Sequence, residues 1–274
     1  MTTTLRPTGP LQQGADGAKA RTYDVCVNSR PVGSIGLATH EVFGPRVCRL
    51  HDLRIAEPDR RRGRGTVAAL AAEEVARGWG CTRIETTVPA DAAAALRLVT
   101  ALGYVERSRR LTKPLTDPVP ALPVGTEGRP MTEAEAEPWL VRAKELYAST
   151  WTDRGLPEDE ARAKAEDDHA RALPNGLATP DTWLSVLIHD DVQVGTLWLS
   201  VLDGDAFVYD VAVHAEHRGH GHGRSLMRLA EAQARAAGRD RIGLNVLADN
   251  APALNLYASL GYEPASYYFC KPLL

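Results

Sequence analysis

Short apolar runs separated by polar turns occupy two stretches of this chain, residues 22–55 and residues 183–214. In the first stretch, strand-forming runs bounded by turn residues predict three antiparallel strands, at residues 23–27, 32–38 and 47–55. The second stretch predicts the same meander, at residues 183–189, 194–201 and 207–214. The hydrophobic pattern therefore predicts a similar three-stranded sheet in each half of the chain.

Segments with helical patterning follow each meander. After the first meander, the sequence predicts a helix, a strand and a helix, at residues 66–79, 83–88 and 92–102. After the second, it predicts a helix, a strand, a helix and a strand, at residues 224–237, 242–246, 251–260 and 267–271. Two further helices, at residues 133–147 and 158–173, are predicted only before the second meander. The first half is therefore expected to be a truncated version of the second.

Three short motifs recur in the same order in both halves. They are Arg-x-x-Gly-x-Gly, Leu-Gly-Tyr and Lys-Pro-Leu, which begin at positions 60, 102 and 113 and again at positions 218, 260 and 271. The offset is 158 positions each time, since 218 − 60, 260 − 102 and 271 − 113 are equal. Self-similarity at a constant offset indicates two copies of one fold, which we call the first copy and the second copy.

The repeat and the local composition predict the domain boundaries. Residues 1–20 are polar and contain Pro and Gly, so we expect a disordered tail. The truncated domain is expected at residues 21–115 and the complete domain at residues 128–274. Residues 116–127 lie in a proline-rich stretch and predict a linker between them.

Composition and charge exclude several classes of protein. A formal net charge of −3 argues against a general nucleic-acid-binding protein, which would carry a basic excess. No apolar run approaches the ~20 residues that span a membrane, and the amino terminus lacks the apolar core of a secretion signal. The four cysteines, Cys26, Cys48, Cys81 and Cys270, form no C-x-x-C pair, so we expect a reduced, cytoplasmic protein without a metal site.

Residues 217–224, His-Arg-Gly-His-Gly-His-Gly-Arg, connect a predicted strand to a predicted helix. Glycine lets the backbone approach a ligand, successive N–H groups can hold an anion, and the helix N-terminus adds its dipole. We therefore expect this loop to hold a diphosphate. It is not a Walker loop, because no Gly-Lys-Ser/Thr is present. A dinucleotide-binding pattern at Gly63, Gly65 and Ala68 is disfavoured, because polar residues 56–62 separate it from its strand.

A second motif follows the glycine-rich loop: Asn-x-x-Ala-x-x-Leu-Tyr-x-x-Leu-Gly-Tyr, which begins at Asn250. Together the two motifs resemble the GNAT superfamily of N-acetyltransferases. The resemblance covers a whole domain in residues 128–274 and about two-thirds of one in the first copy. It implies an α+β fold of two tandem GNAT-like domains, each a mixed, mostly antiparallel sheet flanked by helices, with the first one truncated. It also implies acetyl-CoA as co-substrate.

The resemblance assigns donor-binding residues in the second copy. The backbone of Val211, Ala212 and Val213 is expected to pair with the pantetheine amides, because this strand splays from its neighbour in the family. The diphosphate is expected to bind the loop residues Arg218, Gly219, His220, Gly221, His222, Gly223 and Arg224. The Arg218 side chain has an alternative role, bracing the loop. For the side chains of His220 and His222 we expect positions facing solvent.

The helix after Asn250 carries the expected acid. Asn250 precedes the helix as an N-cap, and Tyr257 lies seven residues later on the same face, so both are expected to face the donor. The resemblance makes Tyr257 the general acid that protonates the departing CoA thiolate; the alternative is a buried aromatic with a satisfied hydroxyl group. At the offset of 158, the first copy has Ala92 and Val99 at these positions. We therefore expect the first copy to be catalytically inactive, and its ability to bind CoA stays open.

A base must also remove the proton of an attacking ammonium group. Asp210 is the nearest acidic residue on the central strand, with solvent and Glu216 as alternatives. Asp52 holds the equivalent position in the inactive copy, which favours a structural role for the aspartate. The amine is expected to attack the thioester directly, without an acyl-enzyme, and the amide of Val211 is a candidate to hold the oxyanion.

The acceptor is expected to be a small-molecule primary amine. Tyr147, Trp151, Trp183 and Trp198 are candidates to line its pocket. The acidic helix at residues 158–173 would suit a cationic amine, although a solvated helix face explains the same charges. Alternatives to this activity are a tandem enzyme similar to mycothiol synthase and a non-catalytic acyl-CoA-binding or sensor protein. We expect no nucleic-acid or membrane partner, and a homodimer is open.

Overall fold

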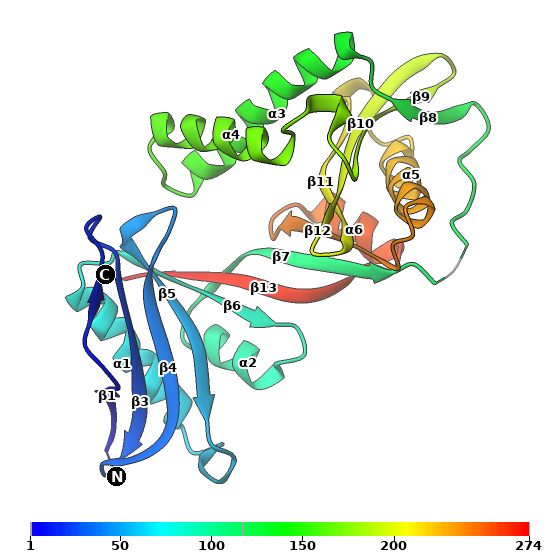
Figure 1. Ribbon diagram of the computed structural model, residues 1–274. Helices are drawn as coiled ribbons and strands as arrows, with labels where there is room; N and C mark the ends of the chain where they lie inside the picture. Colours follow the sequence, from blue (N-terminus) through cyan, green and yellow to red (C-terminus); the bar gives the residue numbers. More distant parts are fainter. Residues whose placement is uncertain (1, 117, 274) are drawn as a thin grey trace. The chain divides into compact units, whose positions relative to one another are not determined.

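The computed structural model describes residues 2–116 and 118–273 and divides into two compact units (Figure 1). Unit 1 comprises Met1–Arg109, Leu247–Asp249 and Ala265–Leu274, and unit 2 comprises Arg110–Val246 and Asn250–Pro264. In each unit, helices flank mixed, mostly antiparallel strands. The expected α+β fold with two tandem domains, the first one truncated, is therefore confirmed.

Unit 1 begins with strands rather than helices. Its strands are β1 (Thr3–Pro7), β2 (Gln12–Gln13), β3 (Lys19–Val27), β4 (Arg30–His40), β5 (Gly44–Ile55), β6 (Arg83–Pro89) and most of β13 (Glu263–Pro272), in the order β1-β3-β4-β5-β6-β13. Its helices are α1 (Arg64–Gly78) and α2 (Ala93–Ala101). Val25 of β3 and Ile35 and Leu37 of β4 are fully buried with Ala68 and Ala72 of α1. Alternate strand positions thus form the core, as the meander pattern predicted.

The first twenty residues include strands, so the expectation of a disordered tail is wrong. β1 pairs antiparallel with β3, from Thr3 opposite Val27 to Pro7 opposite Tyr23. Leu5 packs against the core of unit 1. The residue pattern does not reveal this strand because backbone groups make the pairing, and a polar segment supplies those groups as well as an apolar one.

Unit 2 contains the two additional helices that were expected only in the second copy. Its elements are the second half of β7 (Val105–Pro114), then β8 (Thr126–Pro130), α3 (Glu133–Asp153), α4 (Glu158–Ala172), β9 (Thr182–His189), β10 (Val192–Leu202), β11 (Asp205–Val213), α5 (His222–Ala236), β12 (Arg241–Leu247) and α6 (Ala251–Ser259). The strand order is β7-β12-β11-β10-β9-β8. Residues 116 and 118–125 form no helix or strand.

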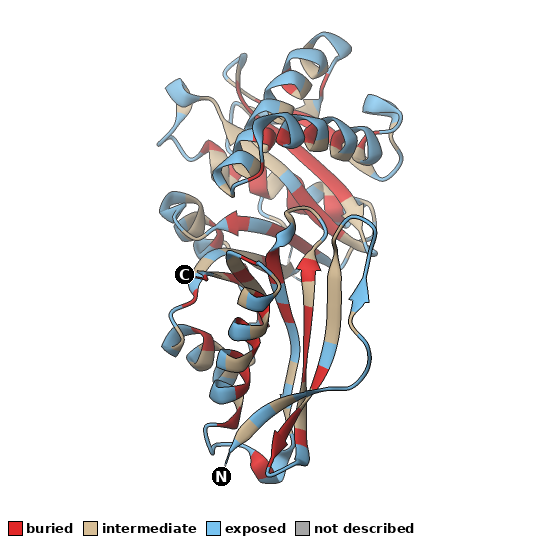
Figure 2. Cartoon of the chain, turned by 90° about the vertical axis from the view of Figure 1, so that its left-hand side faces the viewer, coloured by how far each residue is buried: buried red, intermediate tan, exposed pale blue. Residues whose placement is uncertain are grey.

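The central strands of unit 2 bury both of their faces. On one face, Leu197 of β10 packs with Met227 of α5. On the other face, Trp198 of β10 packs with Trp139 of α3. Figure 1 shows α5 in gold on one side of β10 and the green helices α3 and α4 on the other. Buried positions, red in Figure 2, follow the strands between these helices. The helices that only unit 2 possesses therefore cover the second face of its sheet.

The last strand of each copy completes the unit that the other copy mainly forms. β13, from the second copy, pairs antiparallel with β6 in unit 1, from Ser266 opposite Pro89 to Pro272 opposite Arg83. β7, from the first copy, places Leu111 in the core of unit 2. The units thus depart from the expected boundaries of 21–115 and 128–274. Both strands end in the same Lys-Pro-Leu motif, and the lysine of each motif contacts a buried glutamate in the unit that its strand joins.

Candidate functional site

The glycine-rich loop of unit 2 leads from β11 through a short 3-10 turn, η3 (Ala215–His217), into α5. Gly219 and Gly221 have φ angles of +82° and +85°. Other residues lose about 1–2 kcal/mol in this left-handed region, which explains glycine here. Among the described residues, and apart from the adjacent ones in the chain, no atom lies within 4 Å of the position that a Cβ atom would take on either glycine. Gly221 is also the N-cap of α5, and the N–H groups of His222 and Gly223 precede the first helical hydrogen bond, which runs from Arg224 to Gly221. The loop is therefore open to an anionic ligand.

The side chain of Arg218 braces this loop. Its Nε donates a hydrogen bond to the carbonyl oxygen of Val213 at 3.4 Å. In unit 1, Nε of Arg60 donates to the carbonyl oxygen of Ile55 at 2.9 Å, at positions related by the same offset. The bracing role, which the sequence left as an alternative, is thus the observed contact of both arginines. Any ligand contact from Arg218 would come from its backbone or after a change of rotamer.

β11 separates from β12 before it reaches the loop. The two strands pair in parallel only from Ala206 opposite Ile242 to Val208 opposite Leu244. Within the described residues, no pairing joins β11 to β12 from Tyr209 to Val213. Backbone groups on this edge, including those of Val211, Ala212 and Val213, are thus open to an extended ligand, as a sheet edge is to an added strand. Their pairing with the pantetheine amides stays a prediction.

Helix α6 lies against the start of α5. Asn250 caps α6, since its Oδ1 accepts a hydrogen bond from the N–H of Ala253 at 3.2 Å. Arg224 donates to Oγ of Ser259 at 2.8 Å, which ties α5 to α6. A Cβ atom on Gly223 would lie 3.2 Å from the Leu256 side chain, so this glycine permits close helix packing rather than ligand approach.

Tyr257 of α6 is buried in the core of unit 2, with its ring 5.8 Å from the ring of Tyr262. Burial, followed by the negative charge of Asp210, raises the pKa of Tyr257 to about 12. The phenol therefore stays protonated throughout the neutral pH range and can donate a proton. Val99 is likewise buried in unit 1. The first copy thus keeps a buried apolar side chain at the position of Tyr257, but this side chain, Val99, has no proton to donate.

Asp210 faces the α3 and α4 side of unit 2. It lies opposite Trp198 in the pairing of β10 with β11. A bulge follows this pair, because Leu199 is opposite Val208 and Tyr209 is left without a partner. Burial raises the pKa of the Asp210 carboxyl, and Trp139, Arg142 and His169 offset the rise only in part. A carboxylate with a raised pKa is suited to accept a proton.

Asp52, the equivalent residue in unit 1, has a different environment. Its side chain is 63% exposed and contacts Nδ1 of His51 at 3.0 Å and Arg54 at 3.3 Å. These contacts, led by the hydrogen bond from His51, lower the pKa of Asp52. Its φ angle of +53° is strained for a residue with a side chain. The two aspartates share a position in the repeat but not a protonation behaviour.

An aromatic cluster surrounds Asp210 on this face. Tyr209 stacks on Trp198 with ring centroids 4.8 Å apart, and Trp139 meets Trp198 edge-on at 5.6 Å. The ring of His169 lies 5.5 Å from that of Trp198 and 5.4 Å from that of Tyr147. Tyr209 is 42% exposed, so the stack reaches the surface. The cluster forms an aromatic platform beside the candidate base.

Sequence reasoning found part of this cluster. Tyr147, Trp151 and Trp198 belong to it, with the rings of Tyr147 and Trp151 5.9 Å apart. Trp183 does not, because it packs with the core on the α5 side. Trp139, His169 and Tyr209 also belong to the cluster and were not expected from the sequence. Helical spacing puts Trp139 and His169 on buried faces of α3 and α4, but nothing in the pattern relates those faces to Asp210.

The acidic face of α4 is largely neutralised. Asp168 accepts a hydrogen bond from the Tyr147 hydroxyl at 2.7 Å and pairs with Lys164 at 2.8 Å. Glu158 pairs with Arg162 at 2.6 Å, and Glu166 pairs with Lys144. These contacts favour the interpretation of a solvated, ion-paired helix face over that of an acidic wall for a cationic substrate.

His222 is buried, contrary to the expectation that it faces solvent. Only 7% of its surface is exposed, whereas His220 is exposed in the loop. The difference arises because His222 is the first residue of α5 and lies against the end of β9, where its ring centroid is 5.0 Å from that of His189.

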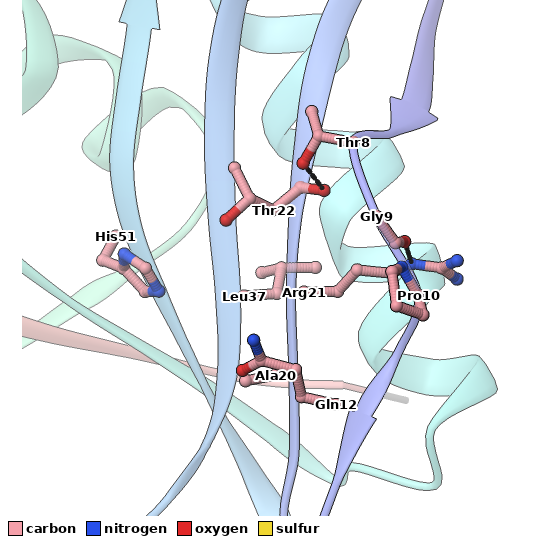
Figure 3. Close-up of a pocket in the computed structure, with 9 residues that line it drawn as sticks. All are labelled: Thr8, Gly9, Pro10, Gln12, Ala20, Arg21, Thr22, Leu37 and His51. Atoms are coloured by element: carbon pink, nitrogen blue, oxygen red, sulfur yellow. Dashed lines mark hydrogen bonds between the residues drawn. The ribbon is translucent and has the colours of Figure 1, made fainter.

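Unit 1 has a polar cavity of about 300 Å³ on the strands near the amino terminus. Figure 3 shows its lining, in which Arg21 donates to the carbonyl oxygen of Gly9 and Thr8 donates to that of Thr22. His51 lies on the opposite wall. This cavity contains neither the loop nor the helix that carry the candidate chemistry.

Within residues 2–116 and 118–273, no group of three or more His, Cys, Asp or Glu side chains is arranged to hold a metal ion. Over the same residues, no helix is both long enough and apolar enough to cross a membrane.

Comparison with known sequences adds independent findings. The profile of the acetyltransferase (GNAT) family matches residues 5–104 and 140–262. The uncharacterized N-acetyltransferase YycN of Bacillus subtilis (strain 168) is 29% identical over 151 residues, which cover 53% of this chain and 96% of that protein. The mycothiol acetyltransferase of Mycolicibacterium smegmatis is 30% identical over 249 residues, which cover 86% of this chain and 78% of that protein.

Two solved structures share the fold over nearly the whole chain. A GCN5-related N-acetyltransferase from Sphaerobacter thermophilus has a TM-score of 0.59 at 17% identity, covering 92% of this chain and 80% of that one. A tandem GNAT protein from the clavulanic acid biosynthesis pathway has a TM-score of 0.52 at 22% identity, covering 96% and 85%. At these identities, both structures bear on the fold alone.

Proposed function

Because the chain belongs to the acetyltransferase (GNAT) family, whose profile matches most of both copies, we propose that unit 2 is an acyl-CoA-dependent N-acetyltransferase. It moves an acetyl group from acetyl-CoA to a primary amine of a small molecule. The observation that carries the proposal is the open glycine-rich loop at the start of α5, which Arg224 ties to the helix of Tyr257. The charge of Asp210 acts on the Tyr257 hydroxyl, which supports complementary roles for these two groups. Unit 1 lacks the acid and serves no chemical step.

The donor binds along β11 and into the glycine-rich loop. Open space at Gly219 and Gly221 leaves room for a diphosphate, which the free N–H groups at the start of α5 attract. The unpaired edge of β11 from Tyr209 to Val213 offers hydrogen-bonding groups to the amides of the pantetheine arm. Acetyl-CoA, when bound, supplies a thioester whose acyl carbon accepts the amine.

Asp210 accepts the proton that the acceptor ammonium must lose, directly or through water. Burial raises its pKa, which makes it a stronger base than an ordinary aspartate. Glu216, the alternative base, lies in η3, where its own backbone N–H followed by nearby histidines lowers its pKa. That environment makes Glu216 the weaker base.

Tyr257 gives its proton to the departing thiolate. The phenol is buried and stays protonated near neutral pH, so it is available in every turnover. The amine attacks the thioester directly, and the N–H of Val211 on the free strand edge is the candidate donor to the developing oxyanion.

The acceptor lies against the aromatic platform of Trp198 and Tyr209. A flat aromatic stack next to a carboxylate attracts a protonated amine through its π-face, with the attraction of about 0.5–2 kcal/mol that cations find over such rings. A second candidate function is mycothiol acetyltransferase activity, favoured by the relative that aligns with 86% of this chain. A non-catalytic acyl-CoA sensor is the alternative from another class.

Calorimetric titration of acetyl-CoA into the protein, together with Gly221→Asp and Gly63→Asp variants, tests the donor site. The two glycines occupy equivalent helix caps, with φ angles of +85° and +71°. We expect one binding site for acetyl-CoA. Gly221→Asp should abolish this binding, because it puts a carboxylate into the loop of unit 2, and Gly63→Asp should leave it intact. Absence of any binding to the unmodified protein would remove the proposed function.

The same variants are then assayed for thiol release with a panel of small amines, including the mycothiol precursor amine. Turnover with any of them, lost in Gly221→Asp, supports the transferase. Donor binding without turnover across the panel supports the sensor alternative.

A further inference from the structure

Five histidines gather where the glycine-rich loop enters α5. They are His189, His214, His217, His220 and His222. His222 lies at the centre, with its ring centroid 5.0 Å from that of His189, 6.1 Å from His220 and 6.4 Å from His217. His214 joins the cluster through His217, at 6.5 Å. The histidines come from β9, η3, the loop and the first turn of α5, so the fold rather than the sequence brings them together.

The equivalent positions in unit 1 carry permanent charges instead. At the offset of 158, His217, His220 and His222 correspond to Asp59, Arg62 and Arg64. Asp59 is buried and forms an ion pair with Arg64 and a two-bond contact with Arg30, at 2.9 and 3.1 Å. In unit 1 this corner is therefore held by a buried ion-pair network of charged side chains. In unit 2 the same corner holds groups that become cationic only by taking up protons.

We propose that the histidine cluster forms part of the phosphate site, so that His222 and its neighbours take up protons when a diphosphate binds in the adjacent loop. This inference rests on the proposed function, in which the loop holds the donor's diphosphate. Without a ligand, cationic imidazoles whose ring centroids lie 5.0–6.5 Å from a neighbouring imidazole would repel one another, which disfavours their simultaneous protonation. A diphosphate beside the imidazoles favours their protonation, because each positive charge then gains an anionic partner.

The charged groups around His222 agree with this behaviour. Burial, followed by His189, His220 and His217, lowers its pKa from the ordinary value. On β9, the neighbour His189 meets Thr126 of β8 at 2.8 Å through Nδ1 and the exposed Asp190 at 3.6 Å through Nε2.

The remaining charged neighbours lie in η3 and the loop. His220 Nδ1 is 3.4 Å from the carbonyl oxygen of His217. Glu216, whose pKa His217, His214 and Arg218 help to lower, is the carboxylate of η3. Among these groups, imidazole is the one whose ordinary pKa lies near neutral pH, so proton uptake should occur at the histidines.

Proton uptake is measured by titrating the donor in several buffers of different ionisation enthalpy at pH 7. The slope of the observed binding enthalpy against buffer ionisation enthalpy gives the number of protons taken up. The 3′-dephospho form of acetyl-CoA is the probe, because a terminal phosphate monoester titrates near pH 6 and would add its own protons. We expect uptake of about 0.5–1 proton, and a dissociation constant that falls about three- to tenfold for each unit of decrease in pH.

The variants His222→Gln and His220→Gln identify the source of the protons. Each should reduce the uptake and flatten the pH dependence, whereas His51→Gln, in unit 1, should change neither. His220 is exposed in the loop, so its variant tests the cluster even where His222→Gln fails to fold. Donor binding with no proton uptake, or with uptake unchanged in both variants, would overturn this inference and leave the transferase proposal standing. No donor binding by the unmodified protein would overturn both.

Discussion

Lys271 of β13 donates hydrogen bonds to both carboxylate oxygens of Glu73 in α1, at 2.9 and 2.7 Å, although 198 positions separate them in the chain. Glu73 is almost fully buried. In unit 2, Lys113 of β7 makes the equivalent contact with the buried Glu231 of α5, at 2.8 Å. Each lysine thus neutralises the buried carboxylate of the other copy, and the exchange of strands is fixed by charge as well as by packing.

Replacing Lys271 with Met should destabilise the protein by about 3 kcal/mol, the lower end of the range for breaking a buried ion pair, because the buried Glu73 then keeps only the longer contact with Arg77, at 4.0 Å. Urea unfolding measures the loss. The double variant Lys271→Met/Glu73→Gln should recover most of it, since no unpaired charge is then buried. Equal losses in the single and double variants would mean that the charge pairing is not what stabilises β13.

Unit 2 should fold as the fragment 105–264 but not as the fragment 116–264. The shorter fragment lacks β7, so the core loses Leu111 and Leu115, Glu231 loses Lys113, and β12 becomes an open edge. Urea unfolding followed by circular dichroism should show a cooperative transition only for the longer fragment. Indistinguishable transitions would show that β7 is dispensable for unit 2.

Tyr257→Phe should lower kcat by about 10²–10³-fold, the loss typical of a general acid, and leave the donor dissociation constant within about twofold. The ring still fills its site, as Val99 does in unit 1, so folding is retained. Steady-state assays and calorimetry measure the two effects. Tyr262→Phe is the matched control, because Tyr262 follows the end of α6 and its ring lies 5.8 Å from the ring of Tyr257. This variant should keep kcat within a few-fold of the unmodified protein. Similar losses in both variants would contradict the assignment.

Asp210→Asn should abolish the acid limb of the pH profile of kcat/KM and lower the rate by about 10²-fold or more. Burial raises the pKa of Asp210, so the base is lost as pH falls through a value above the ordinary 3.8 of an aspartate. Glu216→Gln is the control and should retain both the rate and the limb. A profile that Asp210→Asn leaves unchanged would assign the base to another group.

The start of α3 should lose stability in acid. Glu135 accepts hydrogen bonds from Arg129, at 2.8 and 2.7 Å, and from the N–H of Thr132 at 2.8 Å. Arg129, followed by Thr132, lowers the pKa of Glu135 to about 2. The contribution is therefore present above the ordinary pKa near 4.5 and is lost as pH falls toward 2. Thermal unfolding of Glu135→Gln should vary less with pH over this window than that of the unmodified protein; parallel curves would contradict the prediction.

Alternating apolar positions were sufficient to predict the two meanders, because a strand with one buried face repeats every second residue. The predicted strands at 23–27, 32–38 and 47–55 lie within β3, β4 and β5. The expected N-cap at Asn250 is also confirmed, since capping depends on a local hydrogen bond. In contrast, β1 and β7 were missed: β1 is polar, and β7 follows Leu-Gly-Tyr with mostly charged residues.

Some residues of the candidate site could likewise be predicted from the sequence, and others could not. The order of residues reveals the glycine loop, Asn250 and Tyr257, because each depends on spacing within one loop or one helix turn. It did not indicate that the bulge at Tyr209 turns Asp210 toward Trp139 and His169. Nor did it show His189 beside His222, which are 33 positions apart in the chain and come from a strand and a helix.

The sequence by itself determined that two copies of one fold are present, that the second has two more helices, and that only the second has the tyrosine. These are properties of local pattern and of residue identity. Only the tertiary structure decided which sheet each final strand joins, which carboxylates are buried, and which imidazoles share a corner. The physical reason is that pairing energy and desolvation depend on which groups approach in space, and the Lys-Pro-Leu ending that both final strands share does not specify a partner sheet.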